Sequence, residues 1–321
     1  MSTPSSLSPL SSPSSPALLA SVVTRLRAAG CVFAEEEAEL LHSAASSSTS
    51  SAASSAANPA ASTATTTDIP AALDALVERR VSGVPLEHVL GWAEFAGLRV
   101  AVGPGVFVPR RRTEFLAEQA VTAARPGAVV LDLCCGSGAV GAAVAAALDT
   151  VELYAADVEP AAVHYARRNL GPAVRVYEGD LYAPLPARLR GRVDVLVANA
   201  PYVPTGEIPL LPPEARDHEP LVTLDGGADG LDVQRRVAAE AVRWLAPGGR
   251  LLMETSERQA VRSMALFAGA GLVPRLAVCD ERDATVVIGT RPGRGGARPS
   301  SGSLPNGRPV DDPVRIRSRH P

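Results

Sequence analysis

Apolar positions recur along this chain with two different spacings, and the change between them divides the sequence into two parts. Apolar side chains follow helical spacing over residues 16–30, 34–44 and 70–80. We therefore predict three helices in a small helical domain over residues 16–84. A tract of Ser, Ala and Thr over residues 43–67 interrupts this domain. Because it lacks charge and bulky apolar side chains, we expect a flexible low-complexity insertion there.

A segment with strand-like alternation follows the helical part. Residues 85–109 contain "LRVAVGPGVFVP", which alternates around Gly103-Pro104-Gly105. We expect a β-hairpin that turns at these three residues and links the two parts of the chain. Residues 1–15 are rich in Ser and Pro, and residues 291–321 in Arg, Gly, Pro and Ser, so we predict disorder at both termini.

Beyond the hairpin, short apolar runs alternate with helical patterns over residues 110–290. The expected strands cover residues 128–133, 151–156, 174–178, 193–199, 249–254, 275–280 and 284–290. The expected helices cover residues 138–148, 159–170, 231–246 and 257–270. Such alternation is typical of a mostly parallel sheet with helices on both faces, which places this part of the chain in the α/β class.

Composition and charge narrow the possible classes of protein. The chain has 321 residues, 46% of them apolar, and its net charge of −3 argues against a broad basic surface for nucleic acid. Its four cysteines lack the spacing of a zinc site and are too few for a disulfide framework, so we predict no metal and a cytoplasmic location. No apolar run reaches the roughly 18 residues of a membrane span, and we recognise no signal peptide. We therefore expect no association with a membrane.

A glycine-rich turn follows the first expected strand of the α/β part. In "VVLDLCCGSGAVG", residues Gly136, Gly138 and Gly141 have the spacing of a dinucleotide-binding loop, where a missing Cβ lets the backbone approach a ligand. Asp157 ends the second expected strand about 20 residues further on, where its carboxylate can accept hydrogen bonds from both hydroxyls of a ribose. These residues predict a ligand that contains a nucleoside.

Two further features favour S-adenosylmethionine (SAM) over a dinucleotide. Asp132 lies just before the turn, where a carboxylate suits the cationic amino group of a methionine moiety and would face a pyrophosphate badly. Asp180 and Leu181 follow the third strand, where an adenine would lie. Each acid alone could instead cap a turn or end a strand in solvent, but their common register with the glycines favours a cofactor site. We interpret Cys134 and Cys135 as small apolar residues of a thin loop, without a redox or metal role.

The fourth expected strand ends abruptly in Asn199-Ala200-Pro201-Tyr202. In a parallel sheet, this end lies beside the glycine loop, at the reactive end of the cofactor. The Asn199 side-chain oxygen and the Ala200 carbonyl can each accept a hydrogen bond from one NH₂ group, while Pro201 stiffens the turn. Tyr202 offers a flat face to a planar substrate and to a sulfonium cation. Two such acceptors suit an amide or an aromatic amine, and methyl transfer then needs positioning and oriented dipoles but no nucleophile or strong base.

The order of these motifs resembles the release-factor glutamine methyltransferases, a family of protein-(glutamine N5) methyltransferases. The likeness extends from about Ala71 to Gly289 and is carried by "PLEHVLGWAEFAGLRV", "VFVPRRRTEFLAE", "LDLCCGSGAVG", "GDLYAPL", "NAPY" and "HEPLVTLDGGADGLD". The resemblance implies a Rossmann-like, seven-stranded SAM-dependent methyltransferase domain, joined through a β-hairpin to an N-terminal helical domain that recognises the substrate. It also implies methyl transfer to the glutamine of the Gly-Gly-Gln motif in peptide chain release factors.

The family's site residues map onto this sequence by position. The SAM loop falls on residues 134–138, the ribose acid on Asp157, the adenine-side residue on Leu181 and the substrate motif on Asn199–Tyr202. With the residues argued above, the expected cofactor contacts are Asp132, Cys134, Cys135, Gly136, Ser137, Gly138, Asp157, Asp180, Leu181 and Asn199. The expected substrate contacts are Asn199, Ala200, Pro201 and Tyr202, of which Asn199 and Tyr202 are assigned as catalytic.

The chain also departs from the family's motifs. Ala200 replaces a proline, Cys134 replaces a glycine, and Arg111 and Arg112 replace a proline and an acid. These changes indicate a divergent side branch of the family.

Three other functions compete with this interpretation. Enzymes that methylate adenine N6 or guanine N2 in nucleic acids use similar strand ends but usually bring a basic face, whereas this core is acidic. A non-catalytic binding protein would not need Asp132, Asp157 and the Asn199 turn together. An NAD-dependent dehydrogenase has only the glycine spacing in its favour. The nucleic-acid amino-methyltransferase remains the alternative; a release factor is the expected partner and a monomer the expected state.

Overall fold

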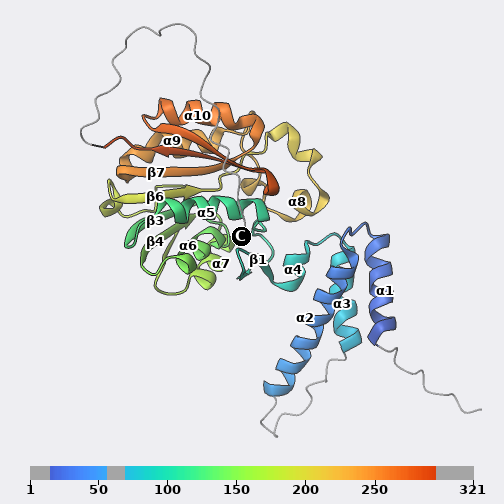
Figure 1. Cartoon of the computed structure of the whole chain (residues 1–321). Helices are drawn as coiled ribbons and strands as arrows, with labels where there is room; N and C mark the ends of the chain where they lie inside the picture. Colours follow the sequence, from blue (N-terminus) through green and yellow to red (C-terminus); the bar gives the residue numbers. More distant parts are fainter. Residues whose placement is uncertain (1–14, 56–68, 294–321) are drawn as a thin grey trace, which may run out of the picture. The chain divides into compact units, whose positions relative to one another are not determined.

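The computed structural model describes residues 15–55 and 69–293 of the chain (Figure 1). The chain forms two compact units, and the division falls between Leu90 and Gly91. The residues predicted to be disordered at both termini, and residues 56–67 of the predicted insertion, lie outside the described part or at its margins. The first unit extends beyond residue 84, where we expected it to end, because a further short helix packs into its core.

The described part of the first unit consists of helices α1 (Ser15–Ala28), α2 (Ala34–Ser55), α3 (Ile69–Val81) and α4 (Leu86–Leu90). Their apolar faces form one core around Leu26, Leu41 and Val77. Arg80 and Glu37 are both buried, and two hydrogen bonds of 2.6 and 3.2 Å join the guanidinium to the carboxylate. This bidentate pair ties α3 to α2.

The expectation of a flexible insertion from residue 43 is wrong for its first part, because α2 continues without a break to Ser55. Alanine has the highest helix propensity, and Ala45 is fully buried in the helical core. Ser46 donates its hydroxyl to the carbonyl of His42, one turn earlier, at 2.9 Å. A lack of bulky apolar side chains therefore does not exclude a helix where alanines supply the packing contacts.

The second unit begins with a hairpin, but its turn is not where the sequence predicted it. β1 (Trp92–Phe95) and β2 (Leu98–Ala101) pair antiparallel around Ala96-Gly97. Both turn residues have positive φ, 49° and 74°, and such a two-residue turn matches the twist of paired strands. Gly103-Pro104-Gly105 forms only a separate turn, closed by the Val106 N–H on the Gly103 carbonyl at 3.2 Å. A proline has no N–H for a strand ladder, so the pairing ends before it.

One seven-stranded sheet supports the rest of this unit. Its strands are β3 (Ala128–Leu133), β4 (Val151–Asp157), β5 (Arg175–Glu178), β6 (Val193–Ala198), β7 (Leu245–Thr255), β8 (Val273–Cys279) and β9 (Ala284–Thr290). The spatial order is β5-β4-β3-β6-β7-β9-β8, and only β9 runs antiparallel to its neighbours. The mostly parallel sheet and its crossover at β3 confirm the predicted Rossmann-like α/β class.

Helices cover both faces of the sheet (Figure 1). On one face lie α5 (Glu114–Ala123), α6 (Ala139–Ala147) and α7 (Pro160–Leu170), and on the other α9 (Asp232–Trp244) and α10 (Ala260–Gly269). Helix α8 (Pro213–His218) belongs to the long connection between β6 and α9. Short 3₁₀ turns complete the unit: η1 (Arg111–Thr113), η2 (Ala187–Leu189), η3 (Thr205–Leu210), η4 (Leu221–Thr223), η5 (Glu257–Gln259) and η6 (Asp280–Arg282).

Candidate functional site

Polar side chains stand at the carboxyl ends of four neighbouring parallel strands, β4, β3, β6 and β7. They are Asp157, Asp132, Asn199 and Glu254. Asp132 pairs with Ala155 on β4 and with Val197 on β6. Side chains two positions apart on a strand point to the same face, so Asp157 and Asn199 lie on the same face as Asp132. Ala198 of β6 pairs with Met253 of β7, and the next residues, Asn199 and Glu254, therefore lie side by side. All four therefore belong to the face that α5, α6 and α7 cover.

The glycine loop is held close to the end of β4. The Gly136 N–H donates to Asp157 Oδ2 at 2.8 Å, and the Gly138 N–H donates to the Cys135 carbonyl at 2.8 Å. Gly136 and Gly138 have φ of 54° and 79°, in the left-handed region that favours glycine. A Cβ on Gly138 would also lie 3.1 Å from Leu170 on α7. The loop is thus thin because both its backbone conformation and its contact with α7 require glycine.

Cys134, Cys135 and Ser137 fill this loop without forming a reactive group. Burial raises the pKa of both thiols well above its usual range, and the charges of Asp132 and Asp157 raise it further. Cys134 has φ of 54° although it is not glycine, which strains the backbone. Ser137 is 2% exposed, and its hydroxyl has no hydrogen-bond partner among the described residues. The loop therefore contains protonated thiols, one strained residue and one unsatisfied hydroxyl.

Asp157 has a structural task that the sequence did not reveal. Its two oxygens accept hydrogen bonds from the N–H groups of Gly136, at 2.8 Å, and Glu159, at 2.9 Å. Burial raises the pKa of this carboxyl, and the backbone hydrogen bonds oppose that rise. A carboxylate offers about four lone-pair sites, so two remain for hydroxyl donors. Asp157 can therefore fix the glycine loop and accept hydrogen bonds from a ribose at the same time.

Asp132 is the more deeply buried acid, at 2% exposure. Burial raises its pKa to about 7, and the charge of Asp157 adds to this rise. The Gly141 N–H, which donates to Oδ2 at 3.0 Å, acts in the opposite direction. Its other oxygen accepts no hydrogen bond from the described residues. Because its ionised form is poorly compensated, a cation bound beside it would be strongly favoured.

Asp180 and Leu181 follow β5, at the far end of the loop region. Leu181 has φ of 48° and packs partly buried against the core, whereas Asp180 is exposed and pairs with Arg236 of α9 at 2.5 Å. The structure thus places Leu181 in an apolar setting that suits a ring, and Asp180 in a surface ion pair.

The end of β6 presents two hydrogen-bond acceptors. The Asn199 amide nitrogen donates to Thr113 Oγ1 of η1 across a long 3.4 Å, which directs the amide and leaves its oxygen without a donor among the described residues. The Ala200 carbonyl likewise accepts no hydrogen bond there, and Ala200 as a whole residue is 1% exposed. Both acceptors named from the sequence therefore lack a donor in the described part of the chain, and Asn199 is the more accessible of the two residues.

The Tyr202 hydroxyl is held by groups on two other segments, β7 and η1. Its hydroxyl donates to Glu254 Oε1 at 3.0 Å, and the same oxygen accepts from Arg112 Nε at 3.2 Å. Burial and the charge of Glu254 raise the Tyr202 pKa above its usual range, so the phenol stays a donor. Burial alone would lower the pKa of Arg112, but Tyr202 and Glu254 outweigh it and the pKa is raised. We call Arg112, Glu254 and Tyr202 the Arg112 bridge.

The segment after α8, from Leu224 to Gly230, and Gln259 of η5 pack against the turn that contains Tyr202. The Gln259 side chain donates to the Tyr202 carbonyl at 2.9 Å and to the Asp229 carbonyl at 3.1 Å. A Cβ on Gly230 would lie only 2.3 Å from the Tyr202 carbonyl oxygen, so this position needs glycine. Val203 also exchanges backbone hydrogen bonds with this segment, through Leu224 and Gly226. The run "LDGGADGLD" thus serves to back the Tyr202 turn.

Sequence analysis missed several residues that hold this site. Thr113, Glu254 and Gln259 contact the β6 end, and Asn169 of α7 donates to the carbonyls of Ala101 and Ser137 at 2.9 and 2.8 Å. Glu254 ends an apolar run, the same signal that marked Asp157 and Asn199, so it could have been found. The others are ordinary helix or turn residues, and only tertiary contacts reveal them.

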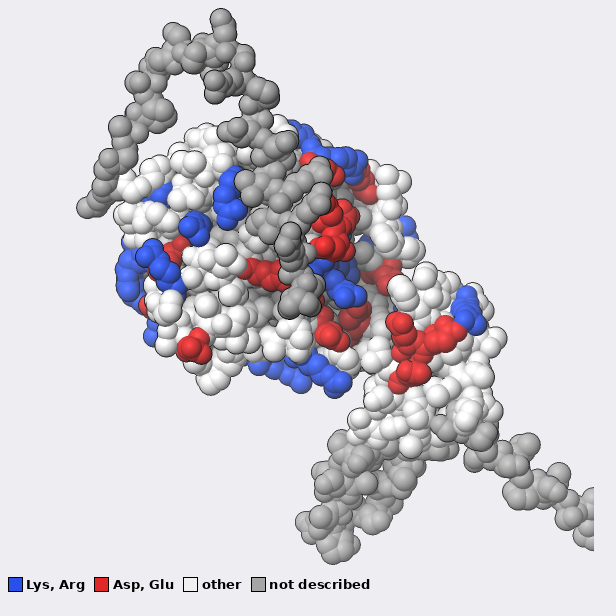
Figure 2. Space-filling view, in the orientation of Figure 1, with Lys and Arg blue, Asp and Glu red and all other residues white. Residues whose placement is uncertain are grey.

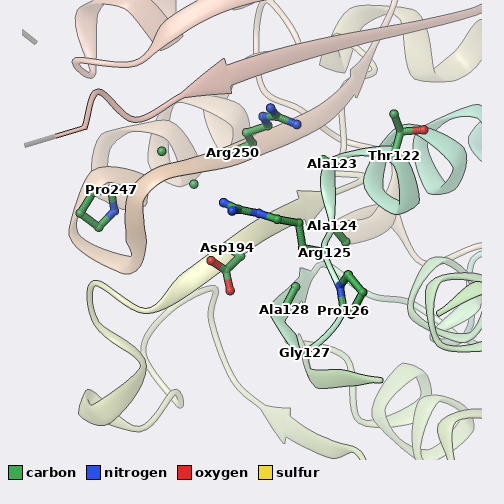
Figure 3. Close-up of a pocket in the computed structure, with 12 residues that line it drawn as sticks. Thr122, Ala123, Ala124, Arg125, Pro126, Gly127, Ala128, Asp194, Pro247 and Arg250 are labelled. Atoms are coloured by element: carbon green, nitrogen blue, oxygen red, sulfur yellow. The ribbon is translucent and has the colours of Figure 1, made fainter. Parts of the chain in front are cut away.

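A pocket of about 670 Å³ lies at the other end of the sheet (Figure 3). It is lined at the amino ends of β3 and β6 and in the turn of β7, by residues that include Arg125, Asp194, Pro247 and Arg250. None of the residues discussed above lines it. In the described residues there is no cluster of three His, Cys, Asp or Glu side chains that could hold a metal ion.

A family model described as the methyltransferase small domain matches residues 97–209. This stretch contains the glycine loop, Asp157 and the β6 turn. With the seven-stranded sheet, the match defines the class of protein: a SAM-dependent methyltransferase.

Sequence relatives narrow the class to one family. The chain is 38% identical over 226 residues to the release factor glutamine methyltransferase of Geobacter sulfurreducens, covering 70% of this chain and 78% of that protein. The corresponding Bifidobacterium longum enzyme is 33% identical over 265 residues, covering 77% of this chain and 89% of that protein. The Mycolicibacterium smegmatis enzyme is 42% identical over 204 residues, covering 63% of this chain and 72% of that protein. The chain belongs to the release factor glutamine methyltransferases, which confirms the resemblance seen in its motifs.

A solved methyltransferase from Pyrococcus furiosus is also similar, with a TM-score of 0.47 and 19% identity over 61% of this chain and 90% of that one. The assignment rests on the sequence relatives and not on this likeness. No helix in the described ranges is both long and apolar enough to cross a lipid bilayer.

Proposed function

We propose that this protein transfers the methyl group of SAM to the side-chain amide nitrogen of a glutamine in a peptide chain release factor, at its Gly-Gly-Gln motif. The pair of free acceptors at the end of β6 carries this proposal. The Asn199 side-chain oxygen and the Ala200 carbonyl can receive the two N–H bonds of one primary amide. The family's proline at residue 200 is not needed for this, because a backbone carbonyl supplies the second acceptor.

The acceptors supply the chemistry that an amide nitrogen needs. Its lone pair is delocalised, so it is a weak nucleophile, and SAM supplies a methyl group activated by a sulfonium. By holding both N–H bonds, Asn199 and Ala200 orient the nitrogen, and they stabilise the positive charge that develops on the N–H groups as the new N–C bond forms. Tyr202 stays protonated and offers its ring as a flat wall. No residue here must act as a strong base.

The glycine loop and the two buried acids fit SAM. Asp132 would pair with the cationic amino group, Asp157 would accept the ribose hydroxyls, and Leu181 would pack on the adenine. The left-handed Gly136 and Gly138, together with the unsatisfied hydroxyl of Ser137, give the loop the shape and polarity of a ligand cradle. Asp180 is an expected contact only if its ion pair with Arg236 opens.

The helical unit is proposed to recognise the release factor, and the protein to act as a cytoplasmic monomer. None of the four cysteines forms a disulfide among the described residues, which suits a reducing compartment. Every site residue discussed comes from the second unit of a single chain. On the face drawn in Figure 2, arginines and acids of that unit are interspersed and form no broad basic area, which favours a protein substrate over nucleic acid.

The test is methyl transfer from labelled SAM to purified release factors, with mass mapping of the modified residue and with total RNA and DNA assayed in parallel. One methyl group on the glutamine of Gly-Gly-Gln, absent with Asn199→Ala, would support the proposal. Label in RNA or DNA would instead establish an amino-methyltransferase of nucleic acids. SAM binding without label in any of these would point to another protein substrate.

A further inference from the structure

Burial makes the Arg112 bridge costly to form. The Glu254 side chain is 3% exposed, and its second oxygen has no hydrogen-bond partner among the described residues. Arg112 is the cation that compensates it, across 3.2 Å. A buried carboxylate with one unsatisfied oxygen is a poor stabilising element, since apolar side chains of similar size would cost less desolvation. Stability alone therefore gives a weak reason for a charged pair at this position.

The bridge connects the buried strand to the open side of the site. The Arg112 side chain is 43% exposed, and its guanidinium carbon lies 5.9 Å from the centre of the Tyr202 ring. Glu254 stands beside Asn199 in the register of β6 and β7. The charged pair is thus adjacent to the acceptors, and it forms no hydrogen bond with Asn199 or Ala200 among the described residues.

Tyr202 is fixed at both ends by this arrangement. Glu254 binds its hydroxyl, and Gln259 binds its carbonyl at 2.9 Å. Because Tyr202 follows Ala200 by two residues, with rigid Pro201 between them, a shift of the Tyr202 backbone would also move the Ala200 carbonyl. The hydroxyl bond therefore holds the ring that forms the wall of the substrate site, and the Gln259 bond holds the backbone next to the Ala200 acceptor.

We propose that Arg112 is a positioning residue for methyl transfer: by pairing with Glu254, it holds the Tyr202 ring in the orientation that receives the substrate amide beside the Ala200 carbonyl. The proposal rests on the proposed function, because it takes the β6 turn as the place where the amide binds. It also accounts for one of the two arginines that depart from the family's motif. Arg111 is exposed and forms no ion pair among the described residues, so it serves as the matched control.

The test compares Arg112→Met, Tyr202→Phe, the double variant of both and Arg111→Met, in the full-length protein with a release factor as substrate. We expect Arg112→Met and Tyr202→Phe each to lower kcat about 10- to 100-fold, because small displacements of reacting groups have effects of this size. The KM for the release factor and the Kd for SAM should change less than about threefold. The double variant should be no slower than the slower single variant, since both break one chain of contacts. Arg112→Lys should recover part of the loss, and Arg111→Met should match the wild type.

Arg112→Met leaves a buried charge unpaired, so stability is separated from activity with Arg112→Met/Glu254→Met. This variant should regain the wild-type melting temperature and stay slow. If it regained both stability and kcat, the bridge would be merely structural and the proposal would be overturned. A wild-type kcat in Tyr202→Phe, which removes one hydroxyl and no charge, would overturn it as well. If the wild type itself fails to methylate any release factor, the proposed function fails instead, and the two failures are distinct.

Discussion

The two ends of the central sheet offer opposite kinds of evidence. At the amino ends of β3 and β6 lies a pocket of about 670 Å³, and its polar groups have partners or solvent. Asp194 accepts a hydrogen bond from the Val129 N–H at 2.9 Å, and Arg125 is exposed to water. At the carboxyl ends, several groups are in energetically unfavourable states. Ser137 and Glu254 each bury an atom that has no hydrogen-bond partner in the described ranges, and Cys134 and Leu181 have left-handed backbone.

This difference indicates where binding energy is to be gained. A buried, poorly compensated group or a strained residue persists only where the surrounding fold enforces it, and a ligand can relieve part of its cost. A hollow lined by solvated side chains offers a ligand much less. The site is therefore proposed at the unsatisfied end of the sheet and not at the amino-end pocket, and five predictions test that contrast.

The largest effect is expected at Asn199. Asn199→Ala removes one of the two acceptors of the substrate amide, so kcat should fall about 10²- to 10³-fold, the range for loss of one preorganised hydrogen-bonding group. The Kd for SAM, measured by calorimetry, should stay within about threefold of the wild type. Loss of SAM binding in this variant would show that Asn199 belongs mainly to the cofactor site.

Asp157→Ala should have the opposite effect to Asn199→Ala: it should weaken SAM binding and leave kcat largely unchanged. It removes the acceptor for the Gly136 N–H as well as for the ribose, so the loop loosens and its ligand loses charge-assisted hydrogen bonds. We expect SAM affinity to fall about 10- to 100-fold. At saturating SAM, kcat should recover most of its value; an unrecovered kcat with normal affinity would contradict this role.

The third prediction concerns pH. Burial raises the pKa of Asp132 from 3.8 to about 7, so below neutrality the free protein holds this carboxyl protonated. Pairing with a cationic amino group requires the ionised form, and binding must then release a proton. SAM affinity should therefore rise about tenfold per pH unit between pH 5 and 7 and level off above pH 7. Asp132→Asn should bind weakly at every pH, and a flat profile in the wild type would exclude the pairing.

Cys134 provides a smaller test of stored strain. A glycine adopts φ of 54° without cost, so Cys134→Gly should stabilise the fold by about 0.5–1 kcal/mol in urea denaturation, after the entropy of glycine in the unfolded chain is included. Cys135→Gly is the control. Cys135 is buried without positive φ, so its loss of packing should destabilise. Equal effects of both changes would argue against strain at Cys134.

The smallest effects are expected at the opposite end of the sheet. Arg125→Gln and Arg250→Gln change the charge of the pocket in Figure 3, which lies away from every site residue. Both kcat and the Kd for SAM should change less than about twofold. A tenfold change in either value would mean that the amino-end pocket takes part in function and that the contrast drawn above is wrong.

The sequence by itself determined the class of fold, and it predicted the cofactor loop and the acceptor turn. Each of these depends on local patterns: alternation of apolar runs, glycines that need positive φ, and polar residues such as Asp157 and Asn199 at the ends of buried strands. The family followed from the order of those motifs. The same local logic failed at the hairpin, because Ala96-Gly97 gives a weaker turn signal than Gly103-Pro104-Gly105, and in α2, where alanines pack without bulk.

Only the tertiary structure decided what holds the site in place. Arg112 and Thr113 lie far from β6 and β7 in sequence, yet η1 brings them to Tyr202, Glu254 and Asn199. Asp157, predicted as the ribose acid, also holds the glycine loop through the Gly136 N–H. Such contacts join residues that no periodicity relates. They arise because a parallel sheet aligns the ends of strands whose connections run through entire helices, and that alignment exists only in the folded chain.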